Sequence, residues 1–189
     1  MASYNYGKDE VMARVLRYAK RIDQYKTLRF LDVGACDGKW SRLITQMVLE
    51  GVRDDEEDLP KIEVDGVEIF KPNAAKILDL YDEFFVGSIS HYSYGYYYYD
   101  IVILGDVIEH MEVAAAQYVI DYACSNAKAD VIVGVPYKYK QGPIYGNPWE
   151  RHIQDDLTPE LMAERYPRLE LMFEAAPDYA YYHKIGGAL

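Results

Sequence analysis

Acidic residues and glycines stand at the ends of several apolar runs in this chain. The first run closes with a turn that contains Gly34 and Gly38, and glycine lets the backbone bend tightly and approach a ligand. The second run ends at Glu68, where a carboxylate can accept hydrogen bonds from two ribose hydroxyls. The third and fourth runs end at Gly87 and Gly105. Together these positions predict a nucleotide-type ligand at one edge of a sheet.

A second group of polar and aromatic residues follows the fifth apolar run, and it contains Glu150 and His152. An imidazole titrates near neutral pH, which suits a general base. We therefore expect His152 or Glu150 to remove a proton from an acceptor; the alternative is that His152 is a packed or surface histidine. His110 either orients an acceptor, or it caps the following helix or makes local hydrogen bonds.

The same residue types raise the question of a metal ion. Asp106, Glu109, His110 and His152 carry ligating groups, but neighbouring positions of one helical turn point in different directions. We therefore expect no metal. The two cysteines, Cys36 and Cys124, lack the spacing of a metal site or a disulfide framework. Free thiols and the absence of a signal peptide indicate a cytoplasmic protein.

Length and charge limit the classes of partner. The chain has 189 residues, enough to bury roughly 70% of the surface that the unfolded form exposes. Its net charge of −11 opposes a phosphate backbone, so nucleic acid is a poor partner. No apolar run approaches the roughly 20 residues that a membrane span needs. A small molecule is the favoured partner, and a homodimer is possible.

Apolar runs and amphipathic segments alternate along the chain. Continuously apolar strands separated by helices predict a parallel sheet that is covered on both faces. The last two strand candidates follow each other without a helix, which predicts a hairpin. The fold class is α/β: a doubly wound, mostly parallel seven-stranded sheet with a C-terminal antiparallel hairpin. The expected strands are 28–33, 62–69, 83–86, 101–104, 131–135, 169–173 and 179–185, and the expected helices are 11–22, 40–51, 72–81, 115–123 and 159–166.

Local signals set several boundaries. Gly51 is expected to end the second helix, and the acidic residues 54–58 to form a solvated loop. Thr158 is expected to cap the last helix, with Pro159 at its first position. The tyrosines of 92–99 are either a binding platform or rings that pack on the domain or on a second subunit, and we favour packing.

Three stretches together resemble the class I S-adenosylmethionine-dependent methyltransferases. Residues 31–38 resemble the glycine-rich first motif, and 67–70 the second motif with its acidic ribose ligand. Residues 99–111 resemble the fourth-strand motif of the family's small-molecule branch, and the segment after Pro136 is similar to that of small bacterial and phage enzymes. The resemblance covers residues 28–136. Two positions depart from it: Cys36 replaces the middle glycine, and Ser88 replaces an acid often found after the third strand.

This resemblance implies a Rossmann-like methyltransferase fold with S-adenosyl-L-methionine as cofactor. The first motif would lie under the amino-acid part of the cofactor, Glu68 would bind the ribose, and the next residues would contact the adenine. The end of the fourth strand would line the methionine side. The implied cofactor-binding residues are Asp32, Gly34, Ala35, Cys36, Gly38, Glu68, Ile69, Phe70, Gly87, Ser88, Ile89, Gly105, Asp106 and Val107.

The implied activity is transfer of a methyl group to an oxygen or nitrogen of an unidentified small-molecule acceptor. We expect one domain over 1–189, with an N-terminal helix in 1–25, a cofactor-binding half in 28–111 and an acceptor-side half in 112–189. The alternative is a non-catalytic S-adenosylmethionine-binding or protein-interaction module. A dinucleotide dehydrogenase would need Gly-x-Gly-x-x-Gly, and an adenine-specific DNA methyltransferase would need Asn/Asp-Pro-Pro-aromatic after the fourth strand; the chain has neither there.

Overall fold

The sheet of the protein has seven strands in the order β3-β2-β1-β4-β5-β7-β6. The computed structural model describes residues 6–23, 26–54, 60–95 and 98–189. β1 to β5 are parallel, whereas β7 runs antiparallel to both β5 and β6. The predicted mostly parallel sheet with a C-terminal hairpin is therefore confirmed. The strands are β1 Thr27–Val33, β2 Lys61–Glu68, β3 Phe84–Val86, β4 Ile101–Gly105, β5 Asp130–Pro136, β6 Leu169–Ala176 and β7 Tyr179–Lys184.

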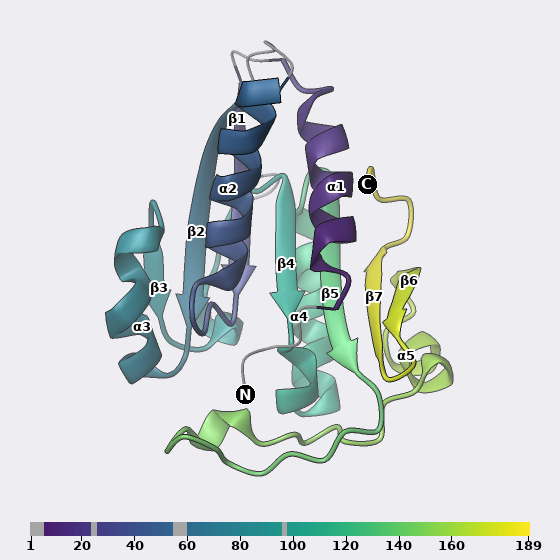
Figure 1. Ribbon diagram of the computed structural model, residues 1–189. Coiled ribbons are helices and arrows are strands. Elements are labelled where there is room, and N and C mark those ends of the chain that lie inside the picture. Colours follow the sequence, from purple (N-terminus) through teal and green to yellow (C-terminus); the bar gives the residue numbers. More distant parts are fainter. Residues whose placement is uncertain (1–5, 24–25, 55–59, 96–97) are drawn as a thin grey trace.

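Helices cover both faces of this sheet. Figure 1 shows α1 and α2 on one face and α4 on the other. α1 and α2 pack on one buried cluster with Phe30 and Ile103, while α4 and α5 pack on another with Leu31 and Leu104. The α-helices are α1 Lys8–Ala19, α2 Lys39–Asp54, α3 Lys71–Ile77, α4 Val113–Asn126 and α5 Pro159–Arg165, and the 3-10 turns are η1 Leu78–Leu80, η2 Ile89–His91, η3 Ile108–His110 and η4 Pro148–Glu150.

The continuous apolar runs arise from this two-sided burial. Successive side chains of a strand point to opposite faces, so a strand with helices on both sides needs apolar residues at every position. In β4, Ile101 and Ile103 belong to one cluster, and Val102 and Leu104 belong to the other. These parallel strands end at the same edge of the sheet, which is where the site lies.

Several predicted boundaries are wrong. Gly51 does not end the second helix, because α2 continues to Asp54, and one glycine inside a helix carries only a modest propensity cost. The expected helix 72–81 stops at Ile77 and tightens into a 3-10 turn. Most of the acidic segment 54–58 lies outside the described residues. Thr158 does cap α5, accepting a hydrogen bond from the Leu161 amide.

The described tyrosines of 92–99 include a packed cluster on the α4 face. The Tyr99 hydroxyl is 2.8 Å from that of Tyr92 and donates to Asp65 at 2.7 Å. The Tyr94 ring meets those of Tyr99 and Tyr122 edge-on. The structure therefore favours packing over a binding platform for these rings, while 96–97 lie outside the described residues. No helix in the described part of the chain has the length and apolar character to cross a membrane.

Candidate active site

A cavity of about 380 Å³ opens at the carboxyl edge of the sheet, between β1 and β4 and their neighbours. Strand order reverses between β1 and β4, and open α/β sheets bind ligands at this reversal. The segment after β5 crosses below the strand ends (Figure 1) and supplies part of the wall. Expected cofactor-binding residues that line the cavity are Gly34, Ala35, Cys36, Glu68, Ile69, Gly87, Ser88, Ile89, Gly105, Asp106 and Val107.

The loop after β1 turns sharply under one end of the cavity. Gly34 has φ of 72°, and a Cβ there would lie only 2.6 Å from Cγ2 of Val107. Cys36, which replaces the middle glycine of the motif, has φ of 49° and so holds the left-handed conformation that glycine adopts freely. The cysteine therefore preserves the loop at some cost in backbone strain.

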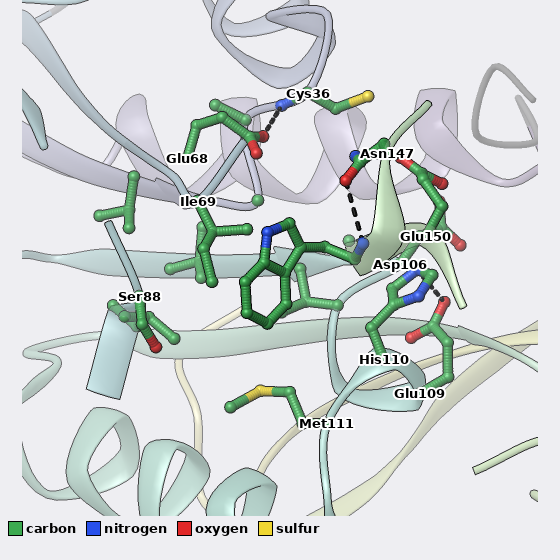
Figure 2. Close-up of a pocket in the computed structure, with 18 of the residues that line it drawn as sticks. Cys36, Glu68, Ile69, Ser88, Asp106, Glu109, His110, Met111, Asn147 and Glu150 are labelled. Carbon is green, nitrogen blue, oxygen red and sulfur yellow. Dashed lines mark hydrogen bonds and ion pairs between the residues drawn. The ribbon is translucent and has the colours of Figure 1, made fainter. Parts of the chain in front are cut away.

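Glu68 at the end of β2 is held by two backbone amides. Its Oε2 accepts from the Cys36 amide at 2.8 Å, and its Oε1 accepts from the Phe70 amide at 2.6 Å. The side chain is buried and lies beside Ile69 at the cavity (Figure 2). Burial raises the pKa of this carboxyl, and the two amide bonds oppose that rise. Each carboxylate oxygen has a second lone pair, so Glu68 can accept two further hydrogen bonds.

Three expected cofactor residues do not line the cavity: Asp32, Gly38 and Phe70. Asp32 lies beneath the loop, where its Oδ2 accepts from the Tyr81 hydroxyl at 2.7 Å. Its Oδ1 has no partner among the described residues, and burial raises its pKa to about 7. Asp32 is therefore placed to support the loop from below.

Asp106 follows β4 and is also left-handed, with φ of 56°. Its Oδ1 accepts from the Tyr179 hydroxyl at 2.8 Å, and its Oδ2 has no partner in the described part of the chain. Burial raises the pKa of Asp106 to about 6, while the charge of Lys8 opposes that rise. Lys8 is itself buried, with its ammonium 4.8 Å from the centre of the Trp40 ring, and burial lowers its pKa to about 8.

Lys8 and Tyr179 do not line the cavity, but both act on Asp106, and the sequence reasoning missed them. Lys8 opens α1 and Tyr179 opens β7, so both come from elements far from the cofactor motifs. No sequence signal marks either one, because a lysine at a helix start and a tyrosine in a hairpin are ordinary.

His110 and His152 meet at one end of the cavity, with ring centres 4.7 Å apart. Nδ1 of His110 is 3.2 Å from the Arg151 carbonyl oxygen, and Nδ1 of His152 is 2.7 Å from that of Tyr139. Because a carbonyl only accepts, Nδ1 must carry the proton in both rings. Burial lowers the pKa of both histidines, which favours neutral rings with a lone pair on Nε2.

Glu109 lies against the same two rings. Only 1% of this residue is exposed, and neither carboxylate oxygen has a hydrogen-bond partner among the described residues. Its Oε1 is 3.9 Å from Nε2 of His110 (Figure 2). Burial, and then the charge of Asp106, raise its pKa well above the ordinary value.

The expectation that neighbouring positions would diverge does not hold for Glu109 and His110. Ligand atoms of Glu109, His110 and His152 all lie within 4.8 Å of one another, and Asp106 is not in this group. η3 is a single 3-10 turn, and the segment after β5 brings His152 across it. Three of the four groups considered from the sequence therefore converge.

Gln154 fastens that segment to η3. Its Nε2 donates to the carbonyls of Ile108 at 2.8 Å and Met111 at 3.0 Å, and its Oε1 accepts from the Tyr166 hydroxyl at 2.8 Å. The amides of Ile153 and Gln154 also donate to the Glu109 carbonyl. A lone glutamine carries no sequence signal for this role.

Glu150 and Trp149 come from the same segment and line the cavity. Asn147 caps η4 by accepting from the Trp149 amide at 3.0 Å, and Gln141 donates to the Glu150 carbonyl at 2.7 Å. The three residues expected to act on an acceptor, His110, Glu150 and His152, thus share one wall.

Comparison with known proteins places the fold. No family model and no curated protein matches the chain. A S-adenosylmethionine-dependent methyltransferase from Archaeoglobus fulgidus is similar in structure, with a TM-score of 0.58, 15% identity, and coverage of 94% of this chain and 93% of that one. N-methyltransferase NodS from Bradyrhizobium japonicum has a TM-score of 0.58 at 9% identity, covering 94% and 96%.

A third similar structure is magnesium protoporphyrin IX methyltransferase from Synechocystis with bound S-adenosylmethionine. Its TM-score is 0.54 at 13% identity, and the match covers 94% of this chain and 78% of that one. At these identities the likeness concerns the fold. The predicted Rossmann-like methyltransferase fold is confirmed.

Proposed function

We propose that this chain is an S-adenosylmethionine-dependent methyltransferase that acts on an oxygen or nitrogen of a small-molecule acceptor. One observation carries the proposal: Glu68, at the end of β2, is oriented by two backbone amides into a cavity at the reversal of strand order. A carboxylate held in this way is suited to ribose hydroxyls. The free thiols of Cys36 and Cys124 support a cytoplasmic location, and we propose one domain over 1–189.

The donors and acceptors around the cavity fit this cofactor. Ile69 and Ile89 offer apolar surface for an adenine, next to the carboxylate that would hold the ribose. At the far end, the buried Oδ2 of Asp106 has no hydrogen-bond partner among the described residues and is suited to accept from an ammonium group. Carboxylates therefore stand where the cofactor would place its ribose and its positive charges.

The activated methyl group on the sulfonium is the chemistry that the cofactor supplies when bound. The protein's own residues have to bind, orient and exclude water, and alignment alone can contribute roughly 7–11 kcal/mol. Trp149 and Met111 add apolar surface to the cavity wall beside the polar groups.

The residues that could remove a proton from the acceptor lie at the end of the cavity where the acceptor would bind. With Nδ1 donating to the Tyr139 carbonyl, His152 keeps a lone pair on Nε2 and can accept a proton. Glu150 is the second candidate on the same wall. An acceptor that is already deprotonated at neutral pH would need neither residue.

Calorimetric titration with S-adenosylmethionine and with S-adenosylhomocysteine tests the cofactor site. We expect micromolar binding by the unaltered protein. Glu68→Gln should weaken it roughly 10- to 100-fold, since a hydrogen bond to a charged group contributes about 1.5–3 kcal/mol. Glu63→Gln is the matched control, because Glu63 lies in the same strand and pairs with Arg29 away from the cavity.

Absence of binding by the folded protein would overturn the proposal. Binding that Glu68→Gln leaves unchanged would place the cofactor elsewhere. A screen of small hydroxyl- and amine-bearing acceptors, read out as release of S-adenosylhomocysteine, then tests catalysis. Tight binding with no turnover on any acceptor would favour a non-catalytic binding module.

A further inference from the structure

A buried carboxylate and two imidazoles converge at the acceptor end of the cavity. Glu109 and His110 come from η3, and His152 comes from the segment after β5, which Gln154 fastens to η3. The ligand atoms of these three side chains lie within 4.8 Å of one another, and all three residues line the cavity. Two imidazoles and one carboxylate form a common ligand set for divalent metal ions.

The environment of Glu109 indicates a missing partner. The residue is 1% exposed, and neither oxygen accepts a hydrogen bond from any described residue. A carboxyl group buried without a partner stays protonated, and it ionises when a cation is bound beside it. The side chain points toward His110 (Figure 2), whose Nε2 is 3.9 Å away, and the neutral ring provides no counter-charge. A cation between these groups would supply one.

Both histidines are arranged as metal ligands usually are. A ligating imidazole typically donates its second ring N–H to a backbone carbonyl or carboxylate, which fixes its tautomer and orientation. Nδ1 of His110 donates to the Arg151 carbonyl, and Nδ1 of His152 donates to the Tyr139 carbonyl. The Nε2 atom of each ring is thereby left with its lone pair for a ligand.

We propose that Glu109, His110 and His152 bind a divalent transition-metal cation. Imidazole and carboxylate together suit Zn²⁺, Co²⁺, Ni²⁺ or Fe²⁺ better than Mg²⁺ or Ca²⁺, which prefer oxygen ligands alone. Ligand atoms around tetrahedral zinc lie about 3.4 Å apart, so a pair at the 4.8 Å limit would close by roughly 1.4 Å on binding. Three protein ligands leave at least one coordination position for a molecule in the cavity.

This cation would also define the acceptor, a consequence that rests on the proposed function. A divalent cation polarises a bound hydroxyl and lowers its pKa, so the proton can pass to water without a protein base. His152 would then be a ligand and not the general base. The acceptor class would be a hydroxyl compound that coordinates the cation through oxygen.

Cobalt uptake tests the site directly. Tag-free protein, treated with a chelator and exchanged into clean buffer, is titrated with Co²⁺, whose visible ligand-field absorption reports four- or five-coordinate binding. We expect one Co²⁺ per chain, displaced by Zn²⁺. Glu109→Gln, His110→Ala and His152→Ala should each weaken binding by at least about 100-fold. His91→Ala is the control, since His91 is an exposed histidine in η2 outside this cluster.

Absence of a stoichiometric Co²⁺ spectrum, or a spectrum that these three variants leave unchanged, would overturn the proposal. Thermal unfolding of each variant shows whether a loss of Co²⁺ binding comes from a loss of folding. The isosteric Glu109→Gln replaces an unpaired buried acid with a neutral group, so without metal it should unfold no earlier than the unaltered protein. Zn²⁺ should raise the Tm of the unaltered protein and leave that of Glu109→Gln unchanged.

Cofactor titration of the same samples separates the two proposals. Co²⁺ binding without S-adenosylmethionine binding would leave the cation site in place and remove the methyltransferase function. S-adenosylmethionine binding without Co²⁺ binding would remove the cation site and leave the proposed methyltransferase function in place. His152 would then again be the candidate general base.

Discussion

Glu68 and Asp32 show how two carboxylates on neighbouring strands come to play different parts. Both are buried, but Glu68 accepts from two backbone amides and lines the cavity, whereas Asp32 accepts from one tyrosine hydroxyl and lies below it. The first can bind a ligand, and the second can only support the loop that shapes the site. Sequence motifs mark both positions equally, so this division becomes visible only in the contacts.

Tyr81→Phe tests the supporting role of Asp32. Burial raises the folded-state pKa of Asp32 from an ordinary 3.8 to about 7, so its ionisation costs stability as pH rises through that range. The Tyr81 hydroxyl favours the charged form, and removing it raises the pKa further. We expect Tyr81→Phe to lower the free energy of unfolding by about 1.5–3 kcal/mol near pH 8.5 and by less near pH 5.

Urea unfolding at the two pH values measures this difference. Tyr118→Phe is the control, because Tyr118 is an exposed tyrosine of α4 that should lose nothing measurable at either pH. If Tyr81→Phe loses the same stability at both pH values, the hydroxyl acts through the packing of the ring. The charge on Asp32 would then play no part in its contribution.

At the scale of elements, the end of the cavity that holds His110 and His152 depends on how the segment after β5 packs on η3. Gln154 satisfies two carbonyls around η3 and accepts from Tyr166 near the end of α5. Gln154→Ala would leave these buried groups without partners, and we expect a loss of about 2–3 kcal/mol in the free energy of unfolding. Hydrogen exchange should accelerate over 139–153 and stay unchanged in β1 and β2.

Gln117→Ala serves as the matched variant, because Gln117 donates one exposed hydrogen bond to the Arg165 carbonyl. It should change stability by no more than about 0.5 kcal/mol. Uniform acceleration of exchange across the whole sheet in Gln154→Ala would contradict a local docking role.

The elements could be predicted from the sequence better than their ends and their contacts. Strands such as β4 and β5 are apolar over nearly their whole length because both faces are buried, so their pattern can be recognised from the local sequence. Gly51 has the residue type of a helix terminator, but α2 continues past it to Asp54. Contacts such as Tyr179 to Asp106 join residues far apart in the chain, and no local pattern encodes them.

The same distinction applies to the site. The turns that follow β1 and β4 are short, so spacing and residue type bring their glycines and acids to the cavity. The meeting of Glu109 and His110 with His152 depends on the docking of a long segment through Gln154. Sequence reasoning could name these residues but could not show that they converge.

At the scale of the whole molecule, one buried carboxylate joins the C-terminal hairpin to the rest of the sheet. Asp130, at the start of β5, accepts from the amides of Val131, Lys184 and Leu189 at 2.8–3.2 Å. Nδ1 of His183 in β7 lies 3.3 Å from its Oδ2. Leu189 is therefore held at the start of β5. β7, the next strand in the sheet, begins at Tyr179, which contacts Asp106.

His183→Asn tests whether this fastening depends on pH. The hydrogen bond with Asp130 raises the pKa of His183, with Glu170 of β6 adding to the rise and burial and Arg14 of α1 opposing it. Because the folded-state pKa exceeds the unfolded value of about 6.5, this contribution is complete below pH 6.5 and is lost as pH rises through the raised pKa. Asparagine can still donate to Asp130 but never carries the charge.

We therefore expect the Tm difference between the unaltered protein and His183→Asn to be largest near pH 6 and to shrink toward pH 9. Asp32 also makes the protein less stable as pH rises toward 7, but both proteins share that loss, so the difference isolates His183. His91→Asn, at an exposed position, should show no such trend. A difference that stays constant across this range would mean that the His183 ring stabilises the hairpin by packing alone, and that the charge pair with Asp130 contributes nothing to holding β7 beside the site.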